Sequence, residues 1–363
     1  MRSIESSLPL EPPEGIQVDW SELPVDLLQE ISKKLLDIFD FVYFRAVCKK
    51  WRAATSTSDL PPQLPWLLQE RYDSESLCFY SLLSDKIRTI QCPLARNKQL
   101  LGPSHGYLYA KGRTFSLLNP LTKDEVTIEF RRFFCPFLVS MGPDPIGSDD
   151  YMAFMDDDLK TTGFYRPCNR EWSFVALPLN DVGCKSCLKG MYYMNEHGTG
   201  NTVVFNIACG SSFVIPSPKA LDSSDQVYFV ESSGKILRIV KNVDLSSPVS
   251  TPNFCFNIYQ LDVEGENEID QCRWVKTNSI GNQILFLDKF NGISNIVSPS
   301  TGLRANSIYY ILNRFESSVS CGLYKYNISD GQAEKVFCPF NNGMNGSTWL
   351  VPNLVSSLPA GHN

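Results

Sequence analysis

Short runs of apolar and aromatic residues, separated by turn residues, fill the chain from about residue 77 to residue 352. The clearest runs lie at residues 106–110, 115–118, 151–154, 172–175, 191–194, 203–205, 227–230, 236–240, 256–259, 284–287, 308–311 and 323–326. Gly, Asn, Asp, Ser and Pro occupy the intervals between them, as hairpin turns require. The pattern predicts many short β-strands, which in one domain form a sandwich, a barrel or a propeller.

An imperfect repeat favours the propeller. A strand rich in tyrosine or phenylalanine follows a polar turn near residues 107, 152, 192, 228, 285 and 309. The first three intervals are about 45, 40 and 36 residues, close to the ~40–50 residues of a propeller blade. The later intervals are irregular. The sequence therefore predicts a mainly β domain of about six irregular blades, with a distorted pair of sandwiches as the alternative.

Residues 23–54 have a different character, which predicts two helices. Pro24 suits the first turn of a helix, where its missing N–H needs no partner. The apolar residues that then recur at helical spacing are Leu27, Leu28, Ile31 and Leu35. Asp40 is expected to cap a second helix, whose apolar residues are Phe41, Phe44, Val47, Cys48 and Trp51. Such a pair has more apolar surface than it can bury internally, although an amphipathic stripe by itself also fits an ordinary packing unit.

Composition places the boundaries around these two regions. Residues 1–18 are polar and proline-bearing, so we expect them to be disordered. The helical module is expected at residues 19–56 and a proline-rich, semi-rigid linker at residues 57–68. The β domain is expected at residues 69–356, followed by a flexible tail at residues 357–363.

Both regions resemble known families. The opening LPVDLL (residues 23–28), then Ile31, Leu35 and Asp40, and the closing RAVCKKWR (residues 45–52) resemble the F-box motif. The β region resembles the large plant group of F-box proteins whose C-terminal part is a kelch-like β-propeller. The segments that carry this second resemblance are LPPQLPWL (60–67), GYL (106–108), LNPLT (118–122), EW (171–172), VYFVESSG (227–234), GNQILFL (281–287), NSIYY (306–310) and WLVP (349–352).

The resemblance implies a non-catalytic adaptor. An F-box binds the small SKP-type adaptor of an SCF cullin–RING ubiquitin ligase, and the propeller then presents a protein substrate. The residues expected to contact the adaptor are Leu23, Pro24, Leu27, Leu28, Ile31, Leu35, Phe41, Phe44, Val47, Cys48 and Trp51. Two alternatives stay open: a propeller that binds proteins outside the ubiquitin pathway and carries an accessory or degenerate F-box, and an enzyme with its site in the central channel.

Charge and hydropathy argue against other partners. The net charge is −6, and the basic clusters at residues 49–52 and 131–132 are too small for a nucleic-acid surface. No apolar stretch approaches the ~20 residues that cross a bilayer, so no membrane partner is expected. The first 20 residues lack the pattern of a secretory signal. We therefore expect the nucleus, the cytoplasm or both, with reduced cysteines.

The remaining candidates for chemistry are weak. Cys184 and Cys187 form one C-x-x-C pair, with His197, Cys168 and Cys209 nearby in sequence, but a structural zinc site needs two such pairs or a spaced histidine pair. The residues 156–158 are three aspartates without EF-hand spacing, and His105 precedes a strand without a visible catalytic partner. His362 lies in the expected tail, and no glycine-rich phosphate loop occurs. No metal or cofactor is expected.

Overall fold

The computed structural model describes residues 19–56, 59–60, 63–69, 75–104, 106–112, 115–128, 137–141, 152–155, 161–166, 171–176, 182–196, 198–222, 224–243, 254–263, 272–288, 292–297, 301–313, 321–340 and 347–354. Its contacts divide the chain into two units, Met1–Gln63 and Leu64–Asn363, which we call the helical unit and the β unit. The segments expected to be disordered or flexible, residues 1–18 and 357–363, lie outside the described residues.

In the described part of the helical unit there are three short helices and not the two expected. A 3-10 turn, η1 (Trp20–Glu22), precedes α1 (Val25–Ser32), α2 (Ile38–Ala46) and α3 (Lys49–Ala53). The chain is extended at Cys48, with φ −159° and ψ 173°, and this residue caps α3. Trp51 therefore lies on α3, and α2 ends before Val47.

The caps also differ from the expectation. Asp37 caps α2, because its carboxylate accepts the Phe39 N–H at 2.8 Å. Asp40 lies inside the first turn of α2, where its negative charge still complements the helix dipole. Pro24 has an extended ψ of 144° and occupies the cap position of α1, directly before the first helical residue.

Aromatic packing holds the helical unit together. Leu28, Phe44 and Ala54 are buried in one cluster, and Leu23, Leu35 and Trp51 pack against it. The rings of Phe44 and Trp51 lie 4.6 Å apart between centroids. Trp51 also donates its indole N–H to the carbonyl of Trp20 at 3.1 Å. The three helices and the 3-10 turn are thus joined through α3.

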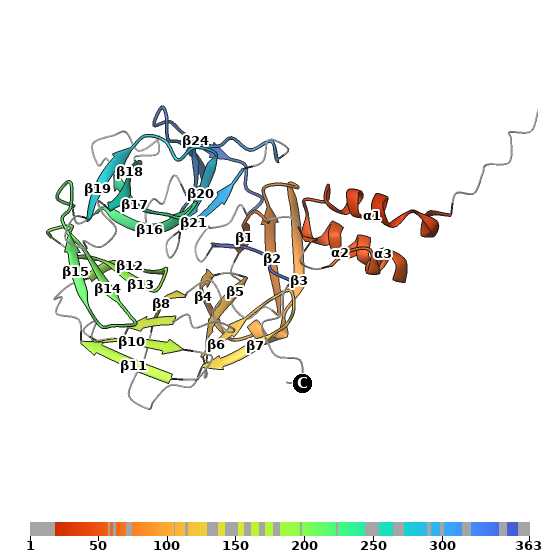
Figure 1. Ribbon diagram of the computed structural model, residues 1–363, viewed down its shortest axis with the longest axis horizontal. Helices are drawn as coiled ribbons and strands as arrows, with labels where there is room; N and C mark the ends of the chain where they lie inside the picture. The colour runs from red at the N-terminus through yellow and green to blue at the C-terminus, as the bar shows by residue number, and fades with distance from the viewer. Residues whose placement is uncertain are drawn as a thin grey trace, which may run out of the picture. The chain divides into compact units, whose positions relative to one another are not determined.

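The described strands of the β unit form a ring of six sheets, which we call blades 1 to 6 (Figure 1). Blade 1 has β1 (Trp66–Gln69), β2 (Ser76–Ser81), β3 (Lys86–Gln91) and the late strand β25 (Thr348–Leu350). Blade 2 has β4 (Gln99–Ser104), β5 (Tyr107–Lys111), β6 (Phe115–Leu118) and β7 (Glu125–Ile128), and a 3-10 turn, η3 (Pro93–Ala95), precedes it. Blade 3 has β8 (Phe137–Met141), β9 (Met152–Met155), β10 (Thr161–Arg166) and β11 (Glu171–Ala176).

The other three blades complete the ring. Blade 4 has β12 (Val182–Leu188), β13 (Met191–Glu196), β14 (Thr202–Asn206) and β15 (Ser212–Ile215). Blade 5 has β16 (Gln226–Ser232), β17 (Lys235–Val243), β18 (Phe254–Val263) and β19 (Cys272–Thr277). Blade 6 has β20 (Gln283–Leu287), β21 (Gly292–Ile296), β22 (Ser307–Leu312), β23 (Gly322–Asn327) and β24 (Ala333–Val336). The expected fold class, helices followed by an irregular propeller of about six blades, is confirmed.

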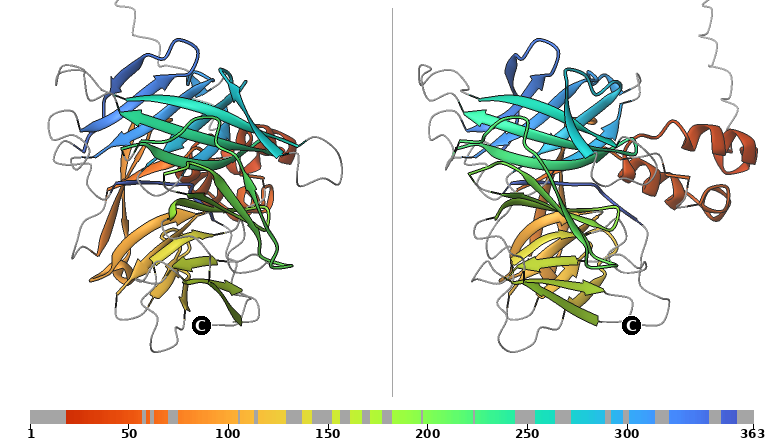
Figure 2. Two further views of the ribbon diagram at one scale, coloured as in Figure 1. Left: turned by 90° about the vertical axis from the view of Figure 1, so that its left-hand side faces the viewer. Right: turned by 60° about the vertical axis from the view of Figure 1, so that its left-hand side comes forward.

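The ring closes in blade 1, where a strand from late in the chain joins strands from the start of the β unit. Strand β25, from the C-terminal end of the β unit, pairs antiparallel with β1, so that Leu67 lies opposite Trp349. Successive blades contact each other through their inner strands, in the order β25, β4, β8, β12, β16 and β21. The further views show the twisted sheets packed side by side (Figure 2). The first and the last described strands of the β unit therefore belong to one sheet.

The pairing of β1 with β25 corrects the expected C-terminal boundary of the linker, residues 57–68. Trp66, Leu67 and Leu68 are the last residues of the segment 57–68, yet they belong to β1 and are buried. Leu67 is buried because its side chain belongs to a core cluster with Tyr80, Phe286 and Trp349, and Trp66 packs on the ring of Phe79. The β unit thus begins at residue 64, before the expected start at residue 69.

Blade 6 breaks the pattern of the other blades. Its strand order is β21-β20-β22-β23-β24, and β20 and β22 run parallel. Strand β21 lies on the inner side of β20, and β22, which begins at Ser307, lies on the outer side of β20. The inserted strand β21 explains why the spacing of the aromatic strands becomes irregular after residue 285.

Candidate functional site

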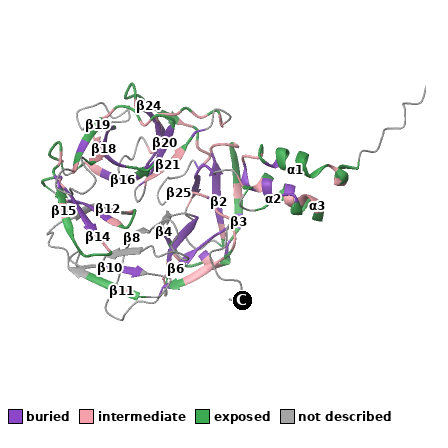
Figure 3. Ribbon diagram, in the orientation of Figure 1, coloured by how far each residue is buried: buried purple, intermediate pink, exposed green. Residues whose placement is uncertain are grey.

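Helix α1 exposes three large apolar side chains. Val25 is 45% exposed, Leu27 is 51% exposed and Ile31 is 39% exposed. Leu27 and Ile31 lie one helical turn apart, so their side chains share a face. Leu28, directly beside Leu27 in sequence, points into the core and is fully buried. Exposed residues follow α1 along most of its length (Figure 3).

Helix α2 and the residue after it also expose apolar side chains. Ile38, Phe41 and Phe44 are buried, while Val42 is 38% and Tyr43 is 61% exposed. Val47, just beyond the helix, is 56% exposed. A helix that is apolar on all sides requires cover on all sides. Within the described residues the chain covers only one side of α2, so the other side is available to a partner.

Polar contacts accompany these exposed apolar side chains. Lys33 donates to the Glu30 carboxylate at 2.8 Å, and this bond lowers the pKa of Glu30 and raises that of Lys33. Arg45 donates to the backbone carbonyl and the hydroxyl of Thr55, which ties the end of α2 to the residues after α3. The exposed charged pair Glu30 and Lys33 thus lies on the same helix as the exposed Leu27 and Ile31, and charged groups of this kind are typical of the rim of a protein interface.

The predicted adaptor-contacting residues divide into three groups. The exposed members are Pro24, Leu27, Ile31 and Val47. The half-buried members are Leu23, Leu35, Cys48 and Trp51. The buried members are Leu28, Phe41 and Phe44, so their place on a contact surface is corrected: the chain itself encloses them, and they support the exposed residues.

Four exposed apolar residues were not part of that prediction: Trp20, Val25, Val42 and Tyr43. Trp20 is 63% exposed and precedes the first helix. The signal for Val42 and Tyr43 was present in the sequence, since the run from Ile38 to Phe44 has too many apolar residues for a helix with one buried face.

The other candidates give no second site. His105, His197, His362, Cys168 and the aspartates 156–158 lie outside the described residues, as do the side chains of Cys184 and Cys187. Elsewhere, no three His, Cys, Asp or Glu residues in the part of the chain that the structure describes lie close enough to hold a metal ion. The described cysteine side chains are free thiols, and Cys209 and Cys255 are exposed.

Neither a membrane-spanning helix nor a site in the central channel is observed in the described part of the chain. Among the described residues, none of the helices has the length and apolar character needed to cross a bilayer. Apart from Gln99 and Leu100 at the start of β4, the side chains of the inner strands β4 and β8, which would line a central channel, lie outside the described residues.

Family comparisons agree with this division into two units. A model of the KIB1-4 beta-propeller matches residues 79–340, and a model of the F-box domain matches residues 20–62. The chain belongs to the KIB1-4 β-propeller family. Its three N-terminal helices are an F-box domain, as the sequence motif predicted.

Several proteins of Arabidopsis thaliana are similar to this chain. The F-box/kelch-repeat protein At1g64840 of Arabidopsis thaliana is 24% identical over 87% of this chain and 89% of its own length. The F-box/kelch-repeat protein At1g57790 of the same plant is 22% identical over 82% of this chain and 84% of its own length. The F-box protein SKIP23, also from Arabidopsis thaliana, is 58% identical over 45 residues, which are 12% of this chain and 11% of that protein.

Proposed function

We propose that this protein is the substrate-recognition subunit of an SCF-type cullin–RING ubiquitin ligase. The F-box would bind a SKP-type adaptor and, through it, the cullin–RING scaffold. The propeller would bind a protein target. No residue of this chain would form or break a covalent bond, and the complex would act in the nucleus, the cytoplasm or both.

One observation carries the proposal: the F-box domain exposes Leu27, Ile31 and Val47 although its own core is already complete. Covering a large aliphatic side chain contributes roughly 1.5–3 kcal/mol of transfer free energy. Association and side-chain ordering offset part of this gain. An apolar helical face of this kind fits a groove of a helical partner. The buried residues Leu28 and Phe44 would then hold the exposed ones in position.

The proposed mechanism is proximity. Holding a target beside a conjugating enzyme converts a bimolecular encounter into an effectively intramolecular one. A propeller suits this role because its closed ring supports many surface loops on a rigid framework. Here the antiparallel pairing of β25 with β1 closes that ring.

The decisive experiment measures adaptor binding by the full chain. Leu27→Asp and Val47→Asp each place a carboxylate at an exposed apolar position and should reduce co-purification of a SKP-type adaptor at least about tenfold, since a buried unpaired charge costs several kcal/mol. Gln29→Asp is the matched control, because it adds the same charge to α1 at an exposed polar position. Equal adaptor binding by the native chain and the Leu27→Asp variant would reject the proposal.

A second measurement addresses the target. Affinity capture from cells with proteasome activity blocked should recover the adaptor with the native chain and not with a chain lacking residues 19–56. The target should be recovered with both. Loss of every partner together with the F-box would show that the propeller does not bind a target independently.

A further inference from the structure

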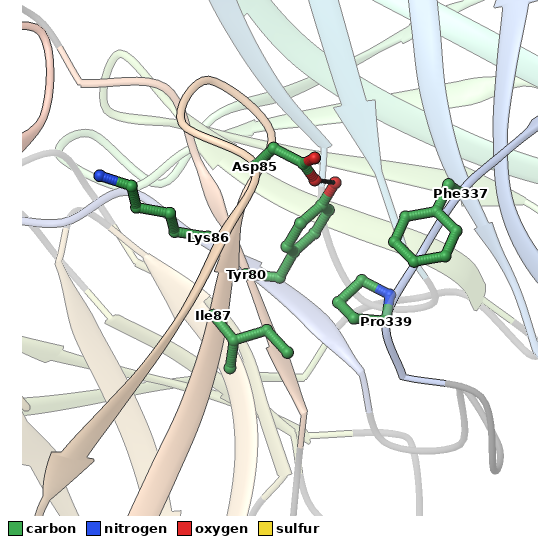
Figure 4. A pocket seen from close by; sticks show the side chains of 6 residues that line it. All are labelled: Tyr80, Asp85, Lys86, Ile87, Phe337 and Pro339. Carbon is green, nitrogen blue, oxygen red and sulfur yellow. Dashed lines mark hydrogen bonds between the residues drawn. The ribbon is translucent and has the colours of Figure 1, made fainter.

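The β unit has a pocket between blade 1 and blade 6 (Figure 4). It has a volume of about 410 Å³ and is lined by Tyr80, Asp85, Lys86, Ile87, Phe337 and Pro339. The hairpin that joins β2 to β3 forms one wall, and the segment after β24 forms the other. The pocket therefore lies within one unit, where the ring fixes both walls.

The walls are mostly apolar and open to solvent. Phe337 is 70% exposed and Ile87 is 52% exposed. Ile87 lies opposite Tyr80 across the β2–β3 pair, so both side chains are on the same face of the sheet. Tyr80 is buried and its ring meets that of Phe340 edge-on, with 6.4 Å between centroids. These contacts give the pocket a rigid base and two exposed apolar sides.

One carboxylate lies at the top of this pocket. Asp85 accepts the Tyr80 hydroxyl at 2.8 Å. Burial and the adjacent Asp85 carboxylate raise the pKa of Tyr80 above its ordinary value, so the phenol keeps its proton at neutral pH and remains the donor. Asp85 has a left-handed backbone, with φ 52°. Because non-glycine residues adopt this conformation only at a cost, the Tyr80 hydrogen bond helps to hold Asp85 in place.

The Asp85 carboxylate is exposed and has no ion-pair partner among the described residues. Within the described part of the chain no basic nitrogen lies within 4.0 Å of the Asp85 carboxylate. Lys86 follows directly in sequence, but its side chain points away from Phe337 and Pro339, whereas the Asp85 carboxylate lies beside the Tyr80 hydroxyl (Figure 4). The pocket thus offers an anionic group above aromatic and aliphatic walls.

We propose that this pocket binds a basic side chain, arginine or lysine, of a partner protein. The aliphatic stem would lie against Ile87, Phe337 and Pro339, and the cationic end would meet the Asp85 carboxylate. Aromatic faces attract cations, which adds to the ion pair. A guanidinium or ammonium on an apolar stem matches this combination of walls and charge.

We expect the basic side chain to belong to a polypeptide, because the strand beside the pocket has an outer edge that can pair with an extended peptide. β3 is the outer strand of blade 1 in the sheet that the described residues form, and Lys86 and Ile87 belong to it. An edge strand can pair with an extended peptide while pockets beside it select side chains. The role of the pocket as a contact for the ligase target rests on the function proposed above; the binding itself does not require the adaptor.

A selection with random peptides tests the proposal. Phage-displayed random dodecapeptides are selected on the immobilised full chain, on Asp85→Asn and on Phe337→Ala. Asparagine keeps an acceptor for Tyr80 and tolerates the left-handed backbone, so Asp85→Asn removes only the charge. We expect arginine or lysine to be enriched at one position on the native chain and at no position on Asp85→Asn.

Fluorescence anisotropy with one selected, labelled peptide then gives the magnitude. Asp85→Asn should weaken binding about tenfold, the effect of losing one charge-assisted hydrogen bond. Lys86→Gln is the control, and it should bind no more weakly than the native chain because this side chain points away. Selection of peptides without a basic residue, failure to select any peptide, or equal binding by the native chain and Asp85→Asn would each overturn the inference.

The same variants separate this inference from the proposed function. Leu27→Asp should lose the adaptor and keep the labelled peptide, whereas Asp85→Asn should lose the peptide and keep the adaptor. If Asp85→Asn keeps both, only the pocket assignment fails. If the native chain binds the peptide and never the adaptor, only the ligase assignment fails.

Discussion

Asp288, directly after strand β20, accepts the backbone N–H of Trp349 on strand β25 at 2.9 Å. Asp288 is fully buried, and the Thr348 hydroxyl also donates to it at 2.6 Å. Trp349 in turn donates its indole N–H to the carbonyl of Leu287 at 3.1 Å. Because β25 belongs to blade 1 and β20 to blade 6, these hydrogen bonds join the first and last blades of the ring.

Replacement of Asp288 should open this junction. Asp288→Ala removes the acceptor of two donors in a buried environment and should lower the free energy of unfolding of the β unit by about 3 kcal/mol. Urea unfolding followed by tryptophan fluorescence measures the change. Asp262→Ala is the control, because Asp262 pairs with the exposed Arg273 at 3.0 Å and such surface pairs contribute less than about 1 kcal/mol. Equal effects of the two substitutions would contradict a special role for Asp288.

Gly292 provides a second test of the contact between blades. A Cβ atom at this position would clash with the Val230 side chain of blade 5 and lie 2.8 Å from Cδ2 of Leu287. Gly292→Ala should therefore destabilise the β unit by about 1–3 kcal/mol. Val230→Ala removes part of the obstacle, so the double variant should lose less stability than the sum of the two single variants. Strict additivity in urea unfolding would show that the close approach of these residues is not the cause.

The raised pKa of Tyr309 leads us to expect that the free energy of unfolding falls in alkaline solution. Burial, and to a lesser extent the charge of Glu334, raise the pKa of Tyr309 to about 12. An unfolded tyrosine ionises near pH 10, so between about pH 10 and pH 12 the folded chain binds more protons than the unfolded chain. The free energy of unfolding should then fall as the pH rises, by up to about 1.4 kcal/mol per pH unit for this group. Below about pH 10 this contribution is fully present.

Urea midpoints between pH 8.5 and pH 11 test that slope, as an order-of-magnitude effect of one titrating group. Tyr309→Phe should give a shallower decrease than the native chain. The decrease should not vanish, because the pKa values of Tyr80 and Tyr326 are raised as well. Tyr43→Phe, at a residue that is 61% exposed, is the control. Parallel curves for the native chain and Tyr309→Phe would contradict the prediction.

The strands that the sequence predicts well are those with two covered faces. The runs at 227–230, 284–287 and 308–311 are continuous stretches of buried apolar residues. The outer strands β3 (KIRTIQ) and β24 (AEKV) are polar and largely exposed, so their sequences resemble those of loops. Exposed residues also mark the outer strands β3, β11 and β15 in Figure 3. The parallel pairing of β20 with β22 depends on long-range contacts, which no local pattern encodes.

The F-box surface was predictable in part for a similar reason. Helical spacing identifies both Leu27 and Leu28 as members of an apolar stripe, yet the first is exposed and the second is fully buried. A stripe wider than about 100° exceeds what one neighbour covers, and only the packing of α2 and α3 decides which part remains free. The helix break at Cys48 could not be predicted from the sequence, because no glycine or proline lies at this position. The pocket at Asp85 joins residues from distant strands and has no sequence signal.

Trp51 shows how the structure changes the choice of variants for the F-box. Its ring packs 4.6 Å from that of Phe44, and its indole N–H bonds to Trp20, so Trp51→Ala should destabilise the helical unit by about 2 kcal/mol or more. Adaptor binding would then fall through loss of structure and not through loss of a contact. Hydrogen exchange of the α2 and α3 amides separates the two causes: Trp51→Ala should speed exchange, and Leu27→Asp should not. Trp51→Phe keeps an aromatic ring beside Phe44 and should recover most of the protection. Unchanged exchange in Trp51→Ala together with lost adaptor binding would instead place the Trp51 ring on the contact surface itself.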